Sequence, residues 1–142
     1  MNILVCISNV PDTTSKIEFT SESSVFDTEG VQFIINPYDE FGLTKAIKLR
    51  EEHGGKVTVI HLGEASSEPT LRKALAIGAD QAIRIDLESK DSFSVAQELA
   101  KLQEQGVKFN NSAILYRVNA QSRAFEEVFI RHNIPYRLIG GV

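Results

Sequence analysis

Short apolar runs alternate with helix-like segments along most of the chain, and this alternation constrains the fold more than any other feature. Residues 2–7 and 57–62 are nearly continuous apolar runs of strand length, and residues 81–85 and 113–116 are shorter runs of the same kind. The segments between them carry apolar residues at helical spacing and end at a glycine. Strands that are apolar on both faces and separated by helices predict a parallel sheet covered on both sides.

The predicted fold is therefore a single three-layer, doubly wound α/β domain spanning residues 1–142. Its five parallel strands are expected at residues 2–7, 57–62, 81–85, 113–116 and 136–139, in the order 3-2-1-4-5, with helices at 37–53, 68–77, 92–105 and 120–132. The polar stretch from Ser8 to Gly30 delays the first helix. It predicts a hairpin-like or irregular excursion, in which residues 16–19 and 31–34 alternate in the manner of strands.

The helical spacing also predicts which side chains face the core. The inward stripe of the first helix is predicted to be Phe41, Leu43, Ala46, Ile47 and Leu49, that of the third Val95, Leu99 and Leu102, and that of the fourth Phe125, Val128 and Phe129. Small ligands of such folds bind where the strand order reverses, here between the first and fourth strands.

Composition and charge narrow the setting. Hydrophobic residues make up 42% and charged residues 24%, and the apolar runs are too short to span a bilayer, so a soluble cytoplasmic protein is expected. Cys6 is the single cysteine and lies in the first apolar run, which predicts a buried, inert thiol in a reducing compartment. Residues 101–142 hold 6 basic and 3 acidic side chains against a net charge of −4 for the whole chain. This asymmetry leaves nucleic-acid binding open, although a solvated basic face explains it as well.

The residue pattern predicts no catalytic centre. The three histidines His53, His61 and His132 have no metal-ligand spacing, and no Ser-His-Asp arrangement can be argued. We therefore expect neither a metal site nor an enzyme.

The first 100 residues contain several recognisable motifs. These are Ile3-Leu4-Val5-Cys6-Ile7, Val10-Pro11-Asp12-Thr13-Thr14, the run from Val31 to Phe41 containing Asn36-Pro37, and the run from Leu71 to Asp80. In these motifs the chain resembles the N-terminal part of the electron transfer flavoprotein β-subunit, and the likeness covers about the first 100 residues.

The C-terminal part shows a different resemblance. Residues 113–123 and 134–141 resemble a fragment of the second motor domain of UvrD/PcrA-type DNA helicases, so that the likeness extends over residues 109–142. The flavoprotein family would carry a glycine- and acid-rich AMP phosphate loop here, and none is found. Two resemblances that meet inside the helix at residues 92–105 predict an engineered chimera, a de novo combination of fragments made to test folding, without native catalytic activity.

The flavoprotein resemblance implies a residual adenosine site. Its residues would be Cys6, Ile7, Asn36, Leu62 and Gly63, whereas Asn36 read from the sequence alone is a helix cap beside Pro37. The resemblance also implies that FAD is held mainly by the partner α-subunit and by segments absent here. We therefore expect no FAD, at most weakly bound AMP, and neither a native α-subunit nor a dehydrogenase as partner.

The helicase resemblance implies an anion or nucleic-acid site at Arg117, Asn119 and Arg123, with a helix cap and solvated arginines as the alternative. Three further functions therefore stay open beside the inactive chimera. They are weak adenine-nucleotide or anion binding in the crevice between Ser8-Asn9 and Arg117-Asn119, weak single-stranded DNA binding, and a role like that of an electron transfer flavoprotein.

Overall fold

The computed structural model describes residues 1–20, 25–87, 92–104 and 119–136. In chain order the elements are β1 (Asn2–Cys6), β2 (Asn9–Pro11), β3 (Phe33–Ile35), α1 (Pro37–His53), β4 (Lys56–Leu62), the short 3-10 helix η1 (Ala65–Ser67), α2 (Glu68–Ile77), β5 (Gln81–Ile85), α3 (Ser92–Glu104) and α4 (Asn119–Arg131). The structure is α/β, as the alternation of apolar runs and helical segments predicts.

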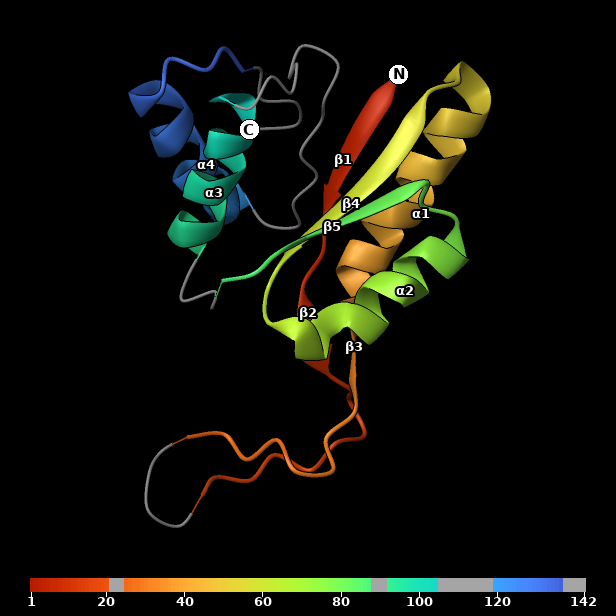
Figure 1. Ribbon diagram of the computed structural model, residues 1–142, viewed down its shortest axis with the longest axis vertical. Helices are drawn as coiled ribbons and strands as arrows, with labels where there is room; N and C mark the ends of the chain where they lie inside the picture. The colour runs from red at the N-terminus through yellow and green to blue at the C-terminus, as the bar shows by residue number, and fades with distance from the viewer. Residues whose placement is uncertain (21–24, 88–91, 105–118, 137–142) are drawn as a thin grey trace.

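Three parallel strands form the described sheet, in the order β1-β4-β5. Ile3 pairs with Val57 and Cys6 with Ile60, and the register continues to β5, where Leu62 pairs with Ile85. Helices α1 and α2 pack together on one face of this sheet (Figure 1). This arrangement is the 3-2-1 half of the predicted order.

The rest of the predicted sheet is not confirmed. The fourth predicted strand, residues 113–116, lies outside the described residues, and so do residues 137–139 of the fifth. Tyr136 is described and belongs to no strand. The five-strand order and the single-domain reading of residues 1–142 therefore stay predictions.

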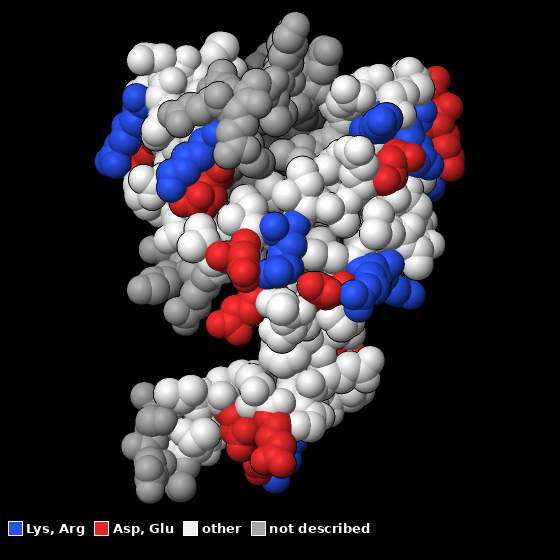
Figure 2. All heavy atoms as spheres, in the orientation of Figure 1, with Lys and Arg blue, Asp and Glu red and all other residues white. Residues whose placement is uncertain are grey.

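The excursion after β1 is a hairpin, as predicted, but its strands pair differently. β3 pairs antiparallel with β2, so that Pro11 lies opposite Phe33, whereas residues 16–19 were expected to form the partner strand. Farther out, an isolated antiparallel bridge joins Phe19 to Phe26. The hairpin projects from the body of the molecule (Figure 1), and acidic side chains gather on it (Figure 2).

Asn36 and Pro37 begin α1, and two glycines after its last residue lie against Met1. The Asn36 side chain accepts a hydrogen bond from the Tyr38 backbone N–H at 3.1 Å, and Pro37 occupies the first helical position. At the other end the Gly54 carbonyl accepts from the amino group of Met1 at 2.7 Å. Gly55 has φ +111°, and a methyl group there would overlap the Met1 backbone. Glycine is therefore required where the chain passes from α1 to β4.

Among the described residues, buried apolar side chains form two clusters. The larger one packs β1, β3 and β4 against α1 and α2, and consists of Ile3, Val5, Ile7, Ile35, Leu43, Ala46, Val57, Val59, Leu71, Ala74 and Ala79. The smaller one joins α3 to α4 through Ala96, Ala100, Val128 and Ile134, with Phe93, Phe125 and Phe129 packed against it.

Most of the stripe predicted for α1 is buried or half-buried, but Phe41 is 72% exposed. It makes an edge-to-face contact with Tyr38 instead. The inward stripe predicted for α4 is confirmed in the smaller cluster. In α3, Ala96 and Ala100 form the buried contact, and the side chains of Leu99 and Leu102 lie outside the described residues. In the parts of the chain that the structure describes, no helix is long and apolar enough to cross a membrane.

Candidate functional site

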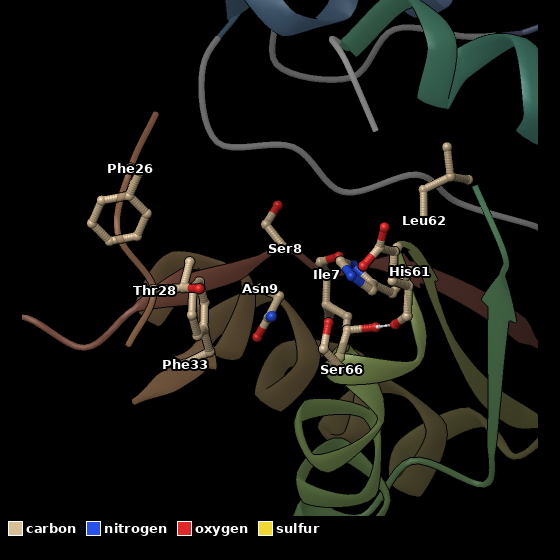
Figure 3. Close-up of a pocket in the computed structure, with 12 residues that line it drawn as sticks. Ile7, Ser8, Asn9, Phe26, Thr28, Phe33, His61, Leu62 and Ser66 are labelled. Atoms are coloured by element: carbon tan, nitrogen blue, oxygen red, sulfur yellow. Dashed lines mark hydrogen bonds between the residues drawn. The ribbon is translucent and has the colours of Figure 1, made fainter. Parts of the chain in front are cut away.

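A cavity of about 770 Å³ opens beyond the carboxyl ends of β1 and β4 (Figure 3). The residues that line it come from the segment between β1 and β2, from the hairpin, and from the end of β4 and the segment that follows it: Ile7, Ser8, Asn9, Phe26, Thr28, Phe33, His61, Leu62, Gly63, Glu64, Ser66 and Ser67. Its volume falls within the range of about 300–1,000 Å³ that is usual for small-molecule sites. Parallel α/β sheets bind ligands at this edge.

His61 and Gly63 form one part of the wall through a close backbone approach. The Nδ1 atom of His61 lies 2.9 Å from the backbone carbonyl oxygen of Ile7, which ties β4 to the residue after β1. A methyl group at position 63 would overlap the imidazole Nε2 and would lie 3.3 Å from Ser67 Oγ. Gly63 is therefore required for the imidazole to occupy its observed place.

Asn9 is held in a fixed orientation by helix α2. The hydroxyl of Thr70, which is buried, donates to Asn9 Oδ1 at 2.6 Å. Because the amide oxygen is occupied in this way, the Asn9 amino group is the part of the side chain available to a ligand. In Figure 3 Asn9 lies between Ser8 and Ser66 at the cavity wall.

The loop between β4 and α2 is fastened at several points. The Ser67 hydroxyl donates to the Glu64 carbonyl at 2.7 Å, and the Gly63 N–H donates to the Ile85 carbonyl at 3.0 Å. Arg84 of β5 donates to the Gly63 carbonyl at 3.0 Å. These bonds fix the floor of the cavity to the neighbouring strand.

A second group of polar atoms lies behind the cavity, where α1 meets the end of β1. The carboxylate of Asp39 accepts from the Ser8 N–H at 2.8 Å. Burial raises the pKa of Asp39, and the hydrogen bond from Ser8 opposes this rise. Burial, with a smaller contribution from the charge of Asp39, raises the pKa of the Cys6 thiol to about 12. A thiol with this pKa stays protonated at neutral pH and is a poor nucleophile.

Three of the five residues of the implied adenosine site line the cavity, and two do not. Ile7, Leu62 and Gly63 line the cavity. Cys6 does not belong to the lining, and the Asn36 side chain is used as the cap of α1. Asn36 is therefore a helix cap, which is the alternative predicted from the sequence. The adenosine role of these five residues stays a prediction.

The residues proposed for anions or nucleic acid can be placed only in part. Arg117 lies outside the described residues, and so does the side chain of Asn119, whose backbone begins α4. Arg123 is exposed on α4. Within the described ranges, no group of three or more His, Cys, Asp or Glu side chains is placed to hold a metal ion.

The sequence reasoning missed the contribution of the hairpin to the site. Phe26, Thr28 and Phe33 line the cavity although they lie far along the chain from Ser8 and Asn9 (Figure 3). One signal could have pointed to them. The excursion leaves β1 and returns to α1 at the same edge of the sheet, so part of it must pass the site.

Comparison with known proteins assigns the chain to a family. The model of the electron transfer flavoprotein domain matches residues 23–126. The chain is 41% identical to the electron transfer flavoprotein subunit beta of Bacillus subtilis over 103 residues, which cover 70% of this chain and 39% of that protein. It is 39% identical to protein FixA of Sinorhizobium fredii over 123 residues, which cover 82% of this chain and 42% of that protein. The chain thus spans about two fifths of the length of these relatives.

These matches correct two expectations and leave the helicase resemblance unconfirmed. The family match passes through the junction predicted at residues 92–105 and continues to residue 126, so it includes the first part of the segment that resembles a helicase. That resemblance stays a prediction.

The prediction of an engineered, de novo chimera without a function of its own is wrong, because the relatives are natural bacterial proteins named for electron transfer. The expectation that no flavoprotein α-subunit is a partner is also wrong, since such relatives are named as one subunit of a larger protein. The chain belongs to the electron transfer flavoprotein domain family.

Proposed function

We propose that this chain acts in electron transfer as part of an electron transfer flavoprotein β-subunit, paired with an α-subunit. The family match over residues 23–126 is the observation that carries this proposal, together with the name shared by relatives such as the Bacillus subtilis protein. In this proposal residues 101–142 belong to the flavoprotein subunit, and no separate nucleic-acid role is assigned to them.

Within that role, we assign the cavity at the ends of β1 and β4 to the nucleoside part of an adenine nucleotide. Three of the residues that the family resemblance implies, Ile7, Leu62 and Gly63, line it. Phe26 and Phe33 add aromatic surface suited to a flat base, and the serine and threonine hydroxyls can bond to a sugar. The lining therefore fits an uncharged, flat and hydroxylated group.

A phosphate group fits the same lining poorly. Glu64 lines the cavity, and the described lining residues include neither lysine nor arginine. A phosphate dianion is usually held by cations or by several backbone N–H groups. The proposal therefore gives the nucleoside to these residues and assigns no phosphate or flavin contact to them.

The chain's own part in this proposal is binding and orientation, with no catalytic step. Cys6, the single cysteine, has a pKa raised to about 12 by burial, which makes it unsuited to redox or nucleophilic chemistry. When bound, the flavin supplies the electron-transfer chemistry.

Co-expression tests the subunit proposal. A tagged α-subunit of the Bacillus subtilis electron transfer flavoprotein would be produced together with this chain or, as the positive control, with its own β-subunit. We expect this chain to co-elute with the α-subunit in size-exclusion chromatography, with flavin absorbance in the same peak. Co-elution of the control but not of this chain would contradict the subunit proposal. Titration calorimetry with adenosine and AMP tests the cavity separately.

A further inference from the structure

His61 presents an oriented hydrogen-bond acceptor at the wall of the cavity. Its Nδ1 lies 2.9 Å from the backbone carbonyl oxygen of Ile7. A carbonyl oxygen only accepts hydrogen bonds, so Nδ1 must carry the proton, and in a neutral imidazole Nε2 then keeps its lone pair. The contact with Ile7 therefore selects the tautomer as well as the ring position.

The Nε2 atom has no hydrogen-bond partner among the described residues. The absence of a side chain at Gly63 leaves the space that the Nε2 edge of the ring occupies. His61 and Gly63 both line the cavity, and Figure 3 shows the imidazole beside Ile7 at its edge.

The other polar side chains of the lining are different in kind. The hydroxyls of Ser8, Thr28 and Ser66 can donate or accept as they rotate, and the Ser67 hydroxyl donates to the Glu64 carbonyl. The Glu64 side chain is exposed. Asn9, oriented by Thr70, offers its amino group as a donor. Asn9 and His61 thus give the cavity one fixed donor and one fixed acceptor.

We propose that His61 is a specificity-determining residue of this cavity, whose Nε2 accepts a hydrogen bond from an N–H or O–H group of the bound nucleoside. This inference rests on the nucleoside role proposed above. The chemical class of ligand is an uncharged nucleoside with a donor at the base or the sugar, such as the exocyclic amine of an aminopurine or a ribose hydroxyl.

Calorimetric titration of variants with matched ligands tests the proposal. The ligands are adenosine, purine riboside, which lacks the exocyclic amine, and 2′-deoxyadenosine and 3′-deoxyadenosine, which each lack one ribose hydroxyl. The proteins are the full chain, His61→Phe, which keeps a ring but removes the acceptor, and His61→Gln, whose amide oxygen can accept. His53→Phe is the control, because His53 is exposed at the end of α1.

We expect His61→Phe to weaken adenosine binding about tenfold, the effect of losing one hydrogen bond. One of the three analogues lacks the group that donates to His61, and His61→Phe should leave the affinity for that analogue unchanged. His61→Gln should recover part of the loss, and His53→Phe should bind all ligands as the unchanged chain does. Thermal melting checks that each variant is folded, and His61→Leu, which also lacks an acceptor, replaces His61→Phe as the test if the latter does not fold.

Two results would overturn the proposal while leaving the nucleoside site in place. They are equal weakening of all four ligands, which indicates a purely structural role, and no weakening of any. If the full chain binds no nucleoside, both the nucleoside site and the role of His61 are refuted. Pairing with the α-subunit, measured separately, would still stand in that case.

Discussion

The hydrogen bond between Thr70 and Asn9 connects the fold to the candidate site, and Thr70→Val tests it. Thr70 is 4% exposed, and its hydroxyl lies 2.6 Å from Asn9 Oδ1. Valine keeps the shape and removes the donor, at a net cost of about 1 kcal/mol for the lost hydrogen bond. Half-buried Asn9 Oδ1 also loses its partner, which costs up to about 1 kcal/mol more. We expect a destabilisation of about 1–2 kcal/mol.

Thermal and urea unfolding measure this change. For a chain of this size, a loss of about 1–2 kcal/mol lowers Tm by about 3–8 °C. Thr58→Val is the matched control, because the Thr58 hydroxyl is 3.4 Å from Gln81 Oε1 in an exposed contact. This control should change the free energy of unfolding by less than about 0.5 kcal/mol. Thr70→Val should also weaken nucleoside binding, since Asn9 is then free to rotate.

A double-mutant cycle with Asn9→Ala shows whether the reasoning is right. If the bond carries the effect, Thr70→Val should cost little once Asn9 has been truncated, with a coupling energy of about 1 kcal/mol. A coupling below about 0.3 kcal/mol, or equal costs for Thr70→Val and Thr58→Val, would refute the argument.

Three further predictions concern the backbone and the titrating groups. Gly55→Ala should lower the free energy of unfolding by more than about 2 kcal/mol, because its methyl group overlaps the Met1 backbone. Gly54 has φ +69° and open space around it, so Gly54→Ala should lower the free energy of unfolding by about 1 kcal/mol. Equal losses for the two variants in urea unfolding would contradict this. Because burial raises the folded-state pKa of Asp39, the contribution of Asp39 to the free energy of unfolding should fall as pH rises from about 4 through that raised pKa. Asp39→Asn should remove this decline, and an unchanged pH dependence in urea unfolding would contradict the assignment. The Cys6 thiol, with a pKa of about 12, should react with a disulfide reagent at pH 8 on the order of a thousandfold more slowly than after unfolding, and comparable rates would contradict the raised pKa.

Local patterns determined most of the secondary structure. α2 and β5 have the bounds that apolar periodicity and the glycine at position 78 predict, and α1 begins at Pro37 and ends before Gly54, as its cap signals indicate. The parallel pairing of β1, β4 and β5 also follows, because short apolar strands joined by helices have few other arrangements. The bounds of the helices and strands depend on neighbours within a few residues, which a single sequence displays.

Residue motifs could not decide the origin of the chain. The short runs at residues 113–123 and 134–141 resemble another family, yet the family match continues to residue 126. Short resemblances are compatible with more than one family when the segment is a common strand-helix-strand unit. The motifs of the first 100 residues did indicate the flavoprotein family, and the family match over residues 23–126 confirms that part of the prediction.

The tertiary structure alone decided how the site is built. The strand that pairs antiparallel with β3 is Asn9–Pro11 and not the predicted residues 16–19. This pairing brings the hairpin to the cavity. His61 showed no metal-ligand spacing in the sequence, and its acceptor role follows from a carbonyl 54 residues away. Asn9 is oriented by a hydroxyl 61 residues away. Hydrogen bonds of this range depend on how packed elements meet in space, and for that reason the sequence determined the strands and helices while the folded chain determined the site.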